Sequence, residues 1–245
     1  MADERRDGVH EVKFPVPPGA LDRVLGWMRG HLAADPHGSG EAGDTYDVQS
    51  LYLDTPGFDV FHRRGSYGRA KFRVRRYGTN PVLFLERKLK RDGVVRKRRV
   101  TVDPAEISRL KGGAKGAKWP GAWFHHRVEL RRLQPVVMMN YRRVARLGQL
   151  AEGPVRVTLD RNLRAVRAEE FRVPEPIVSG DLFESGGVLE VKFATALPVL
   201  VKLMVEEVGL AAGGMSKYRL GMRSCGWVTE EPPEAAAGGG SETGR

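Results

Sequence analysis

Several features that would define other classes of protein are missing from this 245-residue chain. A single cysteine, Cys225, excludes an internal disulfide and a cysteine-based zinc site, which fits a reducing compartment. No apolar run approaches the roughly 20 residues that span a bilayer, and the chain does not open with a charged and then apolar leader. These absences predict a cytoplasmic protein without direct membrane insertion.

Aromatic residues are also few, and acidic residues are outnumbered by basic ones. Aromatic residues make up 8% of the chain and form no obvious stacking platform beside the basic segments, which argues against a nucleic-acid partner. Lys and Arg total 41 against 30 Asp and Glu, and the formal net charge is +11. This balance predicts an acidic partner, but charge alone does not choose among nucleic acid, anionic lipid and a phosphate-rich small molecule.

Length and composition predict one domain. With 41% hydrophobic residues, a chain of this length can bury a substantial core. Residues 1–8 are polar, and the segment 230–245 has the Pro, Gly and Glu content of a disordered tail. We therefore expect a flexible N-terminus over 1–8, a single domain over 9–229 and a disordered tail over 230–245.

One unusual pattern, Glu-x-Lys followed by a hydrophobic residue, occurs three times. The copies begin at Glu11, Glu86 and Glu190, each inside a run that reads as a β-strand. Side chains two apart on a strand point to the same face. Each strand therefore packs its apolar alternate positions on a core and presents an acid and a base side by side on the other face, where function is expected.

Two further segments alternate in the same way. Lys71, Arg73 and Arg75 share one face of a strand, and Arg156, Thr158 and Asp160 share a face of another. The ordinary explanation for one such strand is the solvated side of an antiparallel sheet. Five strands of the same design, in which Lys and Arg outnumber the acids, favour a surface shaped for a polyanion.

The order of the expected elements predicts an α+β fold. Roughly eight strands separated by turns, with helices over 21–32 and 197–208, indicate an antiparallel β-barrel with peripheral helices. If the charged face points inward, only a wet tunnel or a bound polyanion offsets the burial of so many cations. The alternative places the charges outside and the apolar residues inside. Amphipathic helices can, however, cover apolar outer faces.

Several motifs follow one another in a specific order. They are E-x-K-F near the N-terminus, S-L-Y-L-D-T-P, K-F-R-V-R-R-Y-G, L-E-R-K, V-R-V-T-L-D, V-L-E-V-K-F and S-K-Y. Together they resemble the VTC domain, the polyphosphate polymerase member of the triphosphate tunnel metalloenzymes, over about residues 9–221. The resemblance implies a tunnel-forming antiparallel barrel whose basic interior grips a triphosphate and whose glutamate holds Mn²⁺ or Mg²⁺.

Carried over residue by residue, the resemblance assigns roles to the charged face. It implies that Glu190 is the metal ligand, and that the catalytic cations are Arg73, Arg75, Lys88, Lys192 and Lys217. The implied phosphate ligands are Lys13, Lys71, Lys97, Tyr141, Arg143, Arg156 and Ser216. Arg96 and Arg98 are alternatives to Lys97, because the hairpin before them is short.

Other residues are left without an assigned role. Glu11 and Glu86 either assist in the site or orient neighbouring lysines. His125 and His126, which we expect in a loop, receive no role.

The resemblance implies a polyphosphate polymerase, which transfers the γ-phosphoryl group of ATP or another nucleoside triphosphate to a growing inorganic polyphosphate chain. Related triphosphatases carry E-x-E-x-K at the start, and Val9 stands here at the first acid position, which favours the polymerase branch. A metal-dependent triphosphatase is the first alternative. A non-catalytic polyphosphate-binding module is the second, and the presence of Glu190 argues against it.

Overall fold

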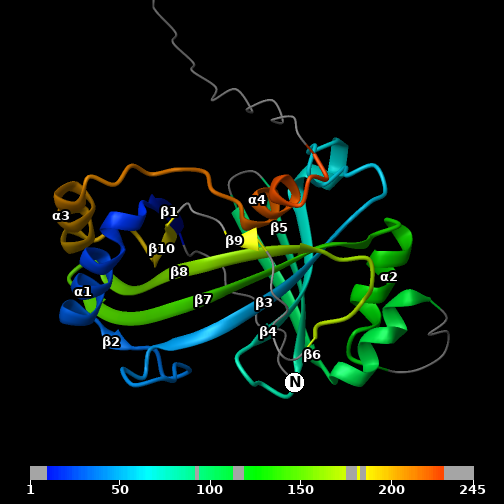
Figure 1. Ribbon diagram of the computed structural model, residues 1–245, viewed down its shortest axis with the longest axis horizontal. Coiled ribbons are helices and arrows are strands. Elements are labelled where there is room, and N and C mark those ends of the chain that lie inside the picture. Colours follow the sequence, from blue (N-terminus) through cyan, green and yellow to red (C-terminus); the bar gives the residue numbers. More distant parts are fainter. Residues whose placement is uncertain (1–9, 92–93, 113–118, 175–180, 183–185, 229–245) are drawn as a thin grey trace, which may run out of the picture.

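The computed structural model describes residues 10–91, 94–112, 119–174, 181–182 and 186–228, and one curled sheet dominates it (Figure 1). Its strands are β1 (His10–Val16), β2 (Ala33–Ala34), β3 (Thr45–Asp54), β4 (Ala70–Tyr77), β5 (Leu83–Arg91), β6 (Val94–Val102), β7 (Gln134–Leu150), β8 (Gly153–Arg167), β9 (Asp181–Leu182) and β10 (Gly187–Phe193). The five strands expected from alternation are therefore present as β1, β4, β5, β8 and β10.

The strands lie in the order β1-β10-β8-β7-β3-β4-β5-β6, with β2 paired to β7 and β9 paired to β8. Each of these pairs is antiparallel. This arrangement confirms the predicted α+β fold of tunnel type.

The expectation of a fully closed barrel needs a correction. In the described part of the chain β1 and β6 remain the two edges of the sheet, and no ladder joins them. The sheet curls until Lys88 Nζ on β5 lies 3.1 Å from Glu11 Oε1 on β1. Paired strands lie about 4.8 Å apart, whereas here two long side chains fill the gap between the strands, so backbone pairing cannot complete the circle.

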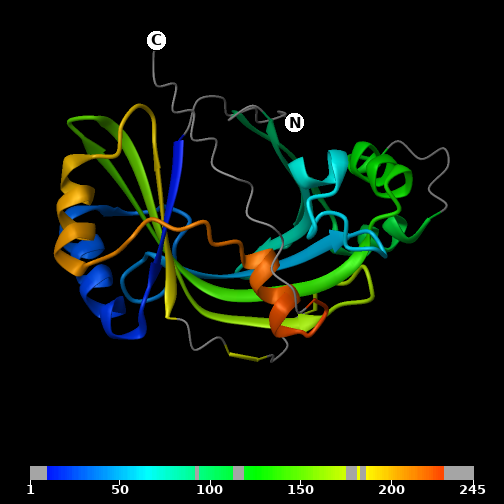
Figure 2. The same cartoon turned by 90° about the horizontal axis from the view of Figure 1, so that it is seen from above.

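Helices cover much of the outer, convex face of the sheet (Figure 2). On one side, α1 (Leu21–His31) and α3 (Val199–Val208) bury Met28 and Met204 against outward-facing residues such as Val157 and Val191. On the other side, η3 (Pro104–Lys111) and α2 (Ala122–Leu130) cover β4 and β5, where Phe124 packs on Phe72. The apolar faces are thus outside and covered by helices, which leaves the charged face inside.

A fourth helix, α4 (Lys217–Ser224), lies on the inner, concave face. It packs Tyr218 and Met222 on an apolar part of that face that includes Val137 and Met139. The hydroxyl of Ser216 caps the helix by accepting a hydrogen bond from the Arg219 backbone N–H. This cap places Ser216 and Lys217 at the edge of the charged region.

The helix bounds agree with the expected ones in two cases and not in a third. The helices expected over 21–32 and 197–208 are α1 and α3, and Gly209 ends α3 with a left-handed φ of 78°. The loop expected around His125 and His126 is wrong, because both lie in α2. That helix has no side-chain cap at its start and buries the ring of His125, so the usual signals of a surface helix are weak.

Other expectations fall outside the described residues. These are the flexible N-terminus over 1–8, the tail over 230–245 and the turn, at 92–93, of the short hairpin before Arg96. The bounds of a single domain over 9–229 stay a prediction. None of the helices in the described ranges combines the length and the apolar composition that a membrane crossing needs.

Candidate functional site

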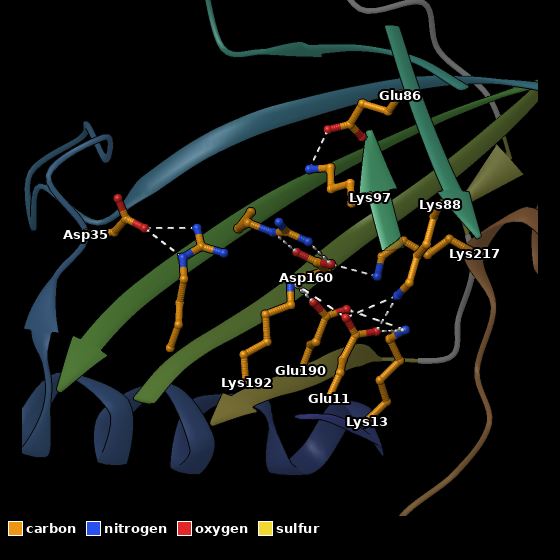
Figure 3. A network of polar contacts seen from close by, with 12 residues as sticks. Glu11, Lys13, Asp35, Glu86, Lys88, Lys97, Asp160, Glu190, Lys192 and Lys217 are labelled. Atoms are coloured by element: carbon orange, nitrogen blue, oxygen red, sulfur yellow. Dashed lines mark hydrogen bonds and ion pairs between the residues drawn. The ribbon is translucent and has the colours of Figure 1, made fainter. Parts of the chain in front are cut away.

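Charged side chains from both halves of the sheet and from α4 meet on one part of the concave face (Figure 3). We call the region that these side chains line the groove. The cations are Lys13, Lys71, Arg73, Arg75, Lys88, Lys97, Arg143, Lys192 and Lys217, and the acids among them are Glu11, Glu86, Asp160 and Glu190. The strands bring them together because each charge sits at an alternate, inward-facing position. Alternation in the sequence indicated Lys13, Lys71, Arg73, Arg75, Lys88 and Lys192 as members of this wall, whereas Lys97, Arg143 and Lys217 came from the family resemblance.

The first cluster joins β1 and β10. Their antiparallel register sets Glu11 opposite Lys192 and Lys13 opposite Glu190. Lys13 Nζ lies 2.7 Å from Glu11 Oε1 and 3.5 Å from Glu190 Oε2, and Lys192 Nζ lies 2.8 Å from Glu190 Oε1 and 3.8 Å from Glu11 Oε2. Figure 3 shows the four side chains pointing toward one another. Two carboxylates thus share two ammonium groups, and Lys88 adds a third contact to Glu11.

Both carboxylates of this cluster are ionised. Burial and the Glu190 carboxylate oppose the charge on Glu11, but the ammonium groups of Lys13, Lys88 and Lys192 prevail and lower the pKa of Glu11 to about 2. Burial likewise opposes the charge on Glu190, and nearby cations, Lys192 first among them, hold its pKa well below the usual range. The cluster therefore supplies two negatively charged carboxylates at neutral pH.

These donors fit a divalent cation that is shared with a substrate. Mg²⁺ is usually held by one or two carboxylates together with substrate phosphates rather than by a cage of protein ligands. Within the described ranges no three His, Cys, Asp or Glu side chains form a group that could hold a metal ion by themselves. Glu190 and Glu11 would thus provide the protein's part of such a site.

A second cluster surrounds Glu86 on β5. Arg73 Nε lies 2.6 Å from Glu86 Oε2, Lys97 Nζ lies 2.7 Å from Oε1, and Arg75 Nη1 lies 4.0 Å from Oε2. Glu86 is 2% exposed. Burial opposes its charge, but Arg73, Arg75 and Lys97 hold its pKa well below the usual range. Glu86 therefore orients these cations in the groove.

Tyrosines and a third acid hold the deeper arginines. Arg75 donates hydrogen bonds of 3.1 Å to the Tyr141 hydroxyl and 2.9 Å to Ser50 Oγ. Arg143 forms a two-point contact with Asp160, at 2.6 and 2.8 Å, and Lys217 Nζ lies 2.6 Å from the same carboxylate. Asp160 is fully buried, but Arg143 and Lys217 outweigh the effect of burial and lower its pKa to about 2.

Lys71 differs from the other cations of the groove. Its ammonium donates a 3.0 Å hydrogen bond to Ser216 Oγ, and among the described residues it has no carboxylate partner. Lys97, in contrast, is paired with Glu86, while Arg96 and Arg98 are exposed on the opposite face of β6. The register thus places Lys97, and neither alternative, on the groove wall.

Arg156 is opposite Lys192 in the register of β8 and β10, but its side chain turns to other partners. Its guanidinium donates to Asp35 Oδ2 at 3.0 and 2.9 Å and to the Tyr46 hydroxyl at 3.1 Å. Figure 3 shows Asp35 well separated from Glu11, Glu190 and Asp160. The residue shares the inward face of β8, but the structure does not bring it into contact with the other cations expected there.

Sequence reasoning missed parts of this site. Asp160 received no role, although it alternates with Thr158 and Arg156 and could have been found from that pattern. Asp35, Tyr52 and Tyr77 also went unassigned. Tyr52 and Tyr77 are within 3.5 and 3.2 Å of Arg73 and Arg75. Tyr77 continues the alternation of Lys71, Arg73 and Arg75 and could have been found from it. Asp35 and Tyr52 come from segments with little charge alternation, so only the fold brings them to the cations.

A model of the VTC domain family matches residues 9–225. The chain belongs to the VTC domain family. The match spans nearly the whole described region, so the groove, the helices around it and α4 all belong to the VTC domain. No curated protein matches the sequence.

Solved structures share the fold of this VTC domain. One is HpAC1 from Hippeastrum, assigned provisionally as an adenylyl cyclase and described as having a dominant triphosphatase activity; it is 15% identical, with a TM-score of 0.51 over 89% of this chain and 96% of its own. Another is a provisionally assigned adenylate cyclase from Bacillus halodurans, 12% identical, with a TM-score of 0.50 over 85% of this chain and 95% of its own. At these identities the likeness concerns the fold alone.

The family and the fold together support a phosphate-related function for this tunnel domain. They also imply dependence on a divalent metal ion, although neither identifies the ion. The two ionised carboxylates of Glu11 and Glu190 agree with that requirement.

Proposed function

We propose that this VTC domain is a polyphosphate polymerase, which transfers the γ-phosphoryl group of ATP to the end of an inorganic polyphosphate chain. The observation that carries the proposal is the uneven charge of the groove. Glu86 contacts three cations, Asp160 two, and Lys71 has no described acid. The wall lacks negative charge, and a chain of phosphates supplies it along its length.

The residue types suit phosphoryl transfer. The transferred group passes through a loose transition state, so catalysis consists mostly of positioning and of electrostatic stabilisation. Arg73, Arg75 and Arg143 offer planar guanidinium groups that bind two phosphate oxygens at once, whereas Lys88, Lys192 and Lys217 act as point charges. Tyr141 holds Arg75 in place with a hydrogen bond. The catalytic and phosphate-binding roles of these residues form part of the proposal.

Metal binding is proposed for Glu190, with Glu11 beside it. Their carboxylates would hold Mn²⁺ or Mg²⁺, which would supply positive charge to offset that of the phosphates. In the absence of substrate, Lys13 and Lys192 neutralise the two carboxylates. Phosphate oxygens offer the same lysines new partners, which would free carboxylate oxygens for the ion.

The acceptor distinguishes a polymerase from a hydrolase. A groove crowded with Lys and Arg binds a phosphate chain strongly, and such a chain, placed end-on to the γ-phosphate, excludes water from attack. Val9 at the first acid position of the triphosphatase pattern supports the same choice. The partners we propose are therefore ATP, or another nucleoside triphosphate, and polyphosphate, with no nucleic acid. Location in the cytoplasm stays a prediction.

A metal-dependent triphosphatase is the second candidate. It is favoured by the shared fold with HpAC1, which is described as having a dominant triphosphatase activity. In that reaction water would take the place of the chain end.

One experiment separates the candidates. Purified protein is incubated with ATP and Mn²⁺, and ³¹P NMR resolves chain phosphate from orthophosphate. The proposal predicts that long-chain polyphosphate accumulates while ATP is consumed. Orthophosphate as the sole product would establish the triphosphatase instead. Intact ATP together with tight polyphosphate binding would mean a non-catalytic binding module.

A further inference from the structure

Asp54 is a buried acid that does not belong to the groove. It ends β3, in the S-L-Y-L-D-T-P motif, and its side chain is fully buried. Its carboxylate accepts hydrogen bonds from the backbone N–H groups of Thr55 at 2.7 Å, Val60 at 2.8 Å and Phe61 at 3.0 Å. It therefore organises the turn after β3 around itself.

The same carboxylate accepts a hydrogen bond from the hydroxyl of Tyr218 on α4. Burial and the Asp54 carboxylate raise the pKa of Tyr218, so the phenol remains a donor. The bond joins two motifs that are 164 residues apart, S-L-Y-L-D-T-P and S-K-Y. This buried contact is separate from the charged contacts of the groove and needs a role of its own.

Further contacts hold the start of α4 against the loop that follows β3. Arg219 donates a 2.6 Å hydrogen bond to the Phe61 carbonyl, and its guanidinium lies over the Phe61 ring. The Tyr218 ring packs against Tyr52 and Phe61, with centroid distances of 5.4 and 6.3 Å. One turn later, a Cβ on Gly221 would lie 2.4 Å from Met139 Sδ. These contacts fix the distance of α4 from the sheet and its rotation about its own axis.

The residues just before Tyr218 act in the groove. Lys217 Nζ lies 2.6 Å from Asp160 and over the Tyr141 ring, at 5.1 Å from its centroid. Ser216 accepts the hydrogen bond from Lys71. A lysine stem is flexible, so the position of its ammonium depends on how firmly the backbone beneath it is held.

We propose that Asp54 and Tyr218 are positioning residues, whose hydrogen bond holds the first turn of α4 so that Lys217 and Ser216 meet the phosphate chain. The inference rests on the proposed function in one respect, namely that these two residues bind phosphate. Neither Asp54 nor Tyr218 needs to touch the substrate. A misplacement of about 1 Å in a site that works by positioning costs up to two orders of magnitude in rate, so the bond matters although it lies outside the groove.

The test is a double-mutant cycle on binding. Tyr218→Phe removes the hydroxyl and keeps the ring, and Lys217→Ala removes the ammonium. Isothermal titration with tripolyphosphate, without metal and at fixed salt, gives Kd for the wild type, for both single variants and for the double variant. Tyr67→Phe is the matched control, since Tyr67 lies outside the groove and contacts Arg131.

We expect Tyr218→Phe to weaken binding about tenfold, and to have much less effect when Lys217 is already Ala. Tyr67→Phe should bind as the wild type does. Asp54→Asn serves as a second variant. It also disturbs the turn after β3, so it should weaken binding at least as much as Tyr218→Phe does, and its effect should likewise shrink when Lys217 is already Ala. Equal losses from Tyr218→Phe with and without Lys217 would overturn the proposal, as would a variant that loses thermal stability and keeps its affinity.

The outcome is separable from that of the proposed function. If ATP is not turned over, yet Tyr218→Phe weakens tripolyphosphate binding through Lys217, the polymerase proposal fails and the positioning role stands. If polyphosphate accumulates normally and Tyr218→Phe binds and reacts like the wild type, the positioning role alone fails.

Discussion

The Lys71 ammonium donates a hydrogen bond to the hydroxyl of Ser216, the residue that caps α4. The bond places a half-buried cation at the positive end of a helix. Burial lowers the pKa of Lys71, and Lys13 on β1, Arg219 on α4, Lys88 on β5 and Arg73 on β4 lower it further, to about 7. The carboxylate of Glu11 on β1 pairs instead with Lys13 and Lys88.

This environment predicts that polyphosphate binding depends on pH. A polyanion favours the protonated form of Lys71, which is the major form below pH 7 and is lost as the pH rises above it. Affinity for long-chain polyphosphate should therefore fall from pH 7 to pH 9, by up to about tenfold per unit if one proton is taken up. Titrations at constant salt measure the slope. Lys71→Arg keeps the charge and should flatten it, and an unchanged slope in that variant would assign the dependence to another group.

Removal of the Glu86 charge should destabilise the protein. Glu86→Gln leaves Arg73, Arg75 and Lys97 without their buried counter-ion, and breaking such a network costs about 3–5 kcal/mol. Urea unfolding measures the change. Glu207→Gln, which alters an exposed pair with Arg23, should cost less than about 0.5 kcal/mol. Saturating polyphosphate should reduce the loss in Glu86→Gln, because phosphate replaces the missing charge; equal losses with and without polyphosphate would contradict this.

Glu86 should also make the stability of the protein depend on pH in the acidic range. Its folded-state pKa is lowered, so its contribution to stability is present above the ordinary glutamate pKa and is lost as the pH falls below that value. The difference in unfolding free energy between wild type and Glu86→Gln should therefore shrink under acidic conditions. A difference that stays constant down to the acid transition would show that Glu86 acts through packing rather than through charge.

Glu190→Gln should separate binding from turnover. The substitution removes a proposed metal ligand and one negative charge from the wall, so Mn²⁺-dependent consumption of ATP should disappear while polyphosphate binding stays equal or becomes tighter. ³¹P NMR and a metal-free binding titration measure the two effects. Glu207→Gln is the matched control. Normal turnover in Glu190→Gln would remove this residue from the site.

Salt should weaken binding steeply. The attraction joins a polyanion to many wet or half-buried cations, and the Debye length shortens from about 10 Å at 0.1 M to about 3 Å at 1 M ionic strength. Affinity measured over this range should fall continuously on a logarithmic salt scale. A flat response would indicate that apolar contacts or hydrogen bonds dominate recognition.

The sequence predicted the wall of the groove better than its contacts. Alternation in β4, β5, β8 and β10 depends only on the two-residue period of a strand, so the inward face could be read directly. Register could not be read so easily, because a shift of one residue exchanges the two faces. That is why Lys97 remained open against Arg96 and Arg98 until the pairing of β5 with β6 set Lys97 opposite Lys88.

Partners distant in sequence were beyond prediction. Asp35 pairs with Arg156 across 121 residues, and Tyr218 reaches Asp54 across 164. Such contacts depend on how the sheet curls and on where α4 is seated, and neither leaves a local pattern. Helix α2 was missed for a different reason, since its apolar residues do not recur at helical spacing as clearly as those of α1 and α3 do.

The pair between Lys88 and Glu11 has a mechanical consequence. It joins the two sides of the sheet where, among the described residues, no backbone ladder does, and both side chains are partly exposed, at 36% and 20%. Parting an ion pair of this kind costs on the order of 1 kcal/mol. This contact is therefore held by charges that salt screens, so raising the salt concentration should weaken it, whereas strands joined by backbone hydrogen bonds keep their spacing.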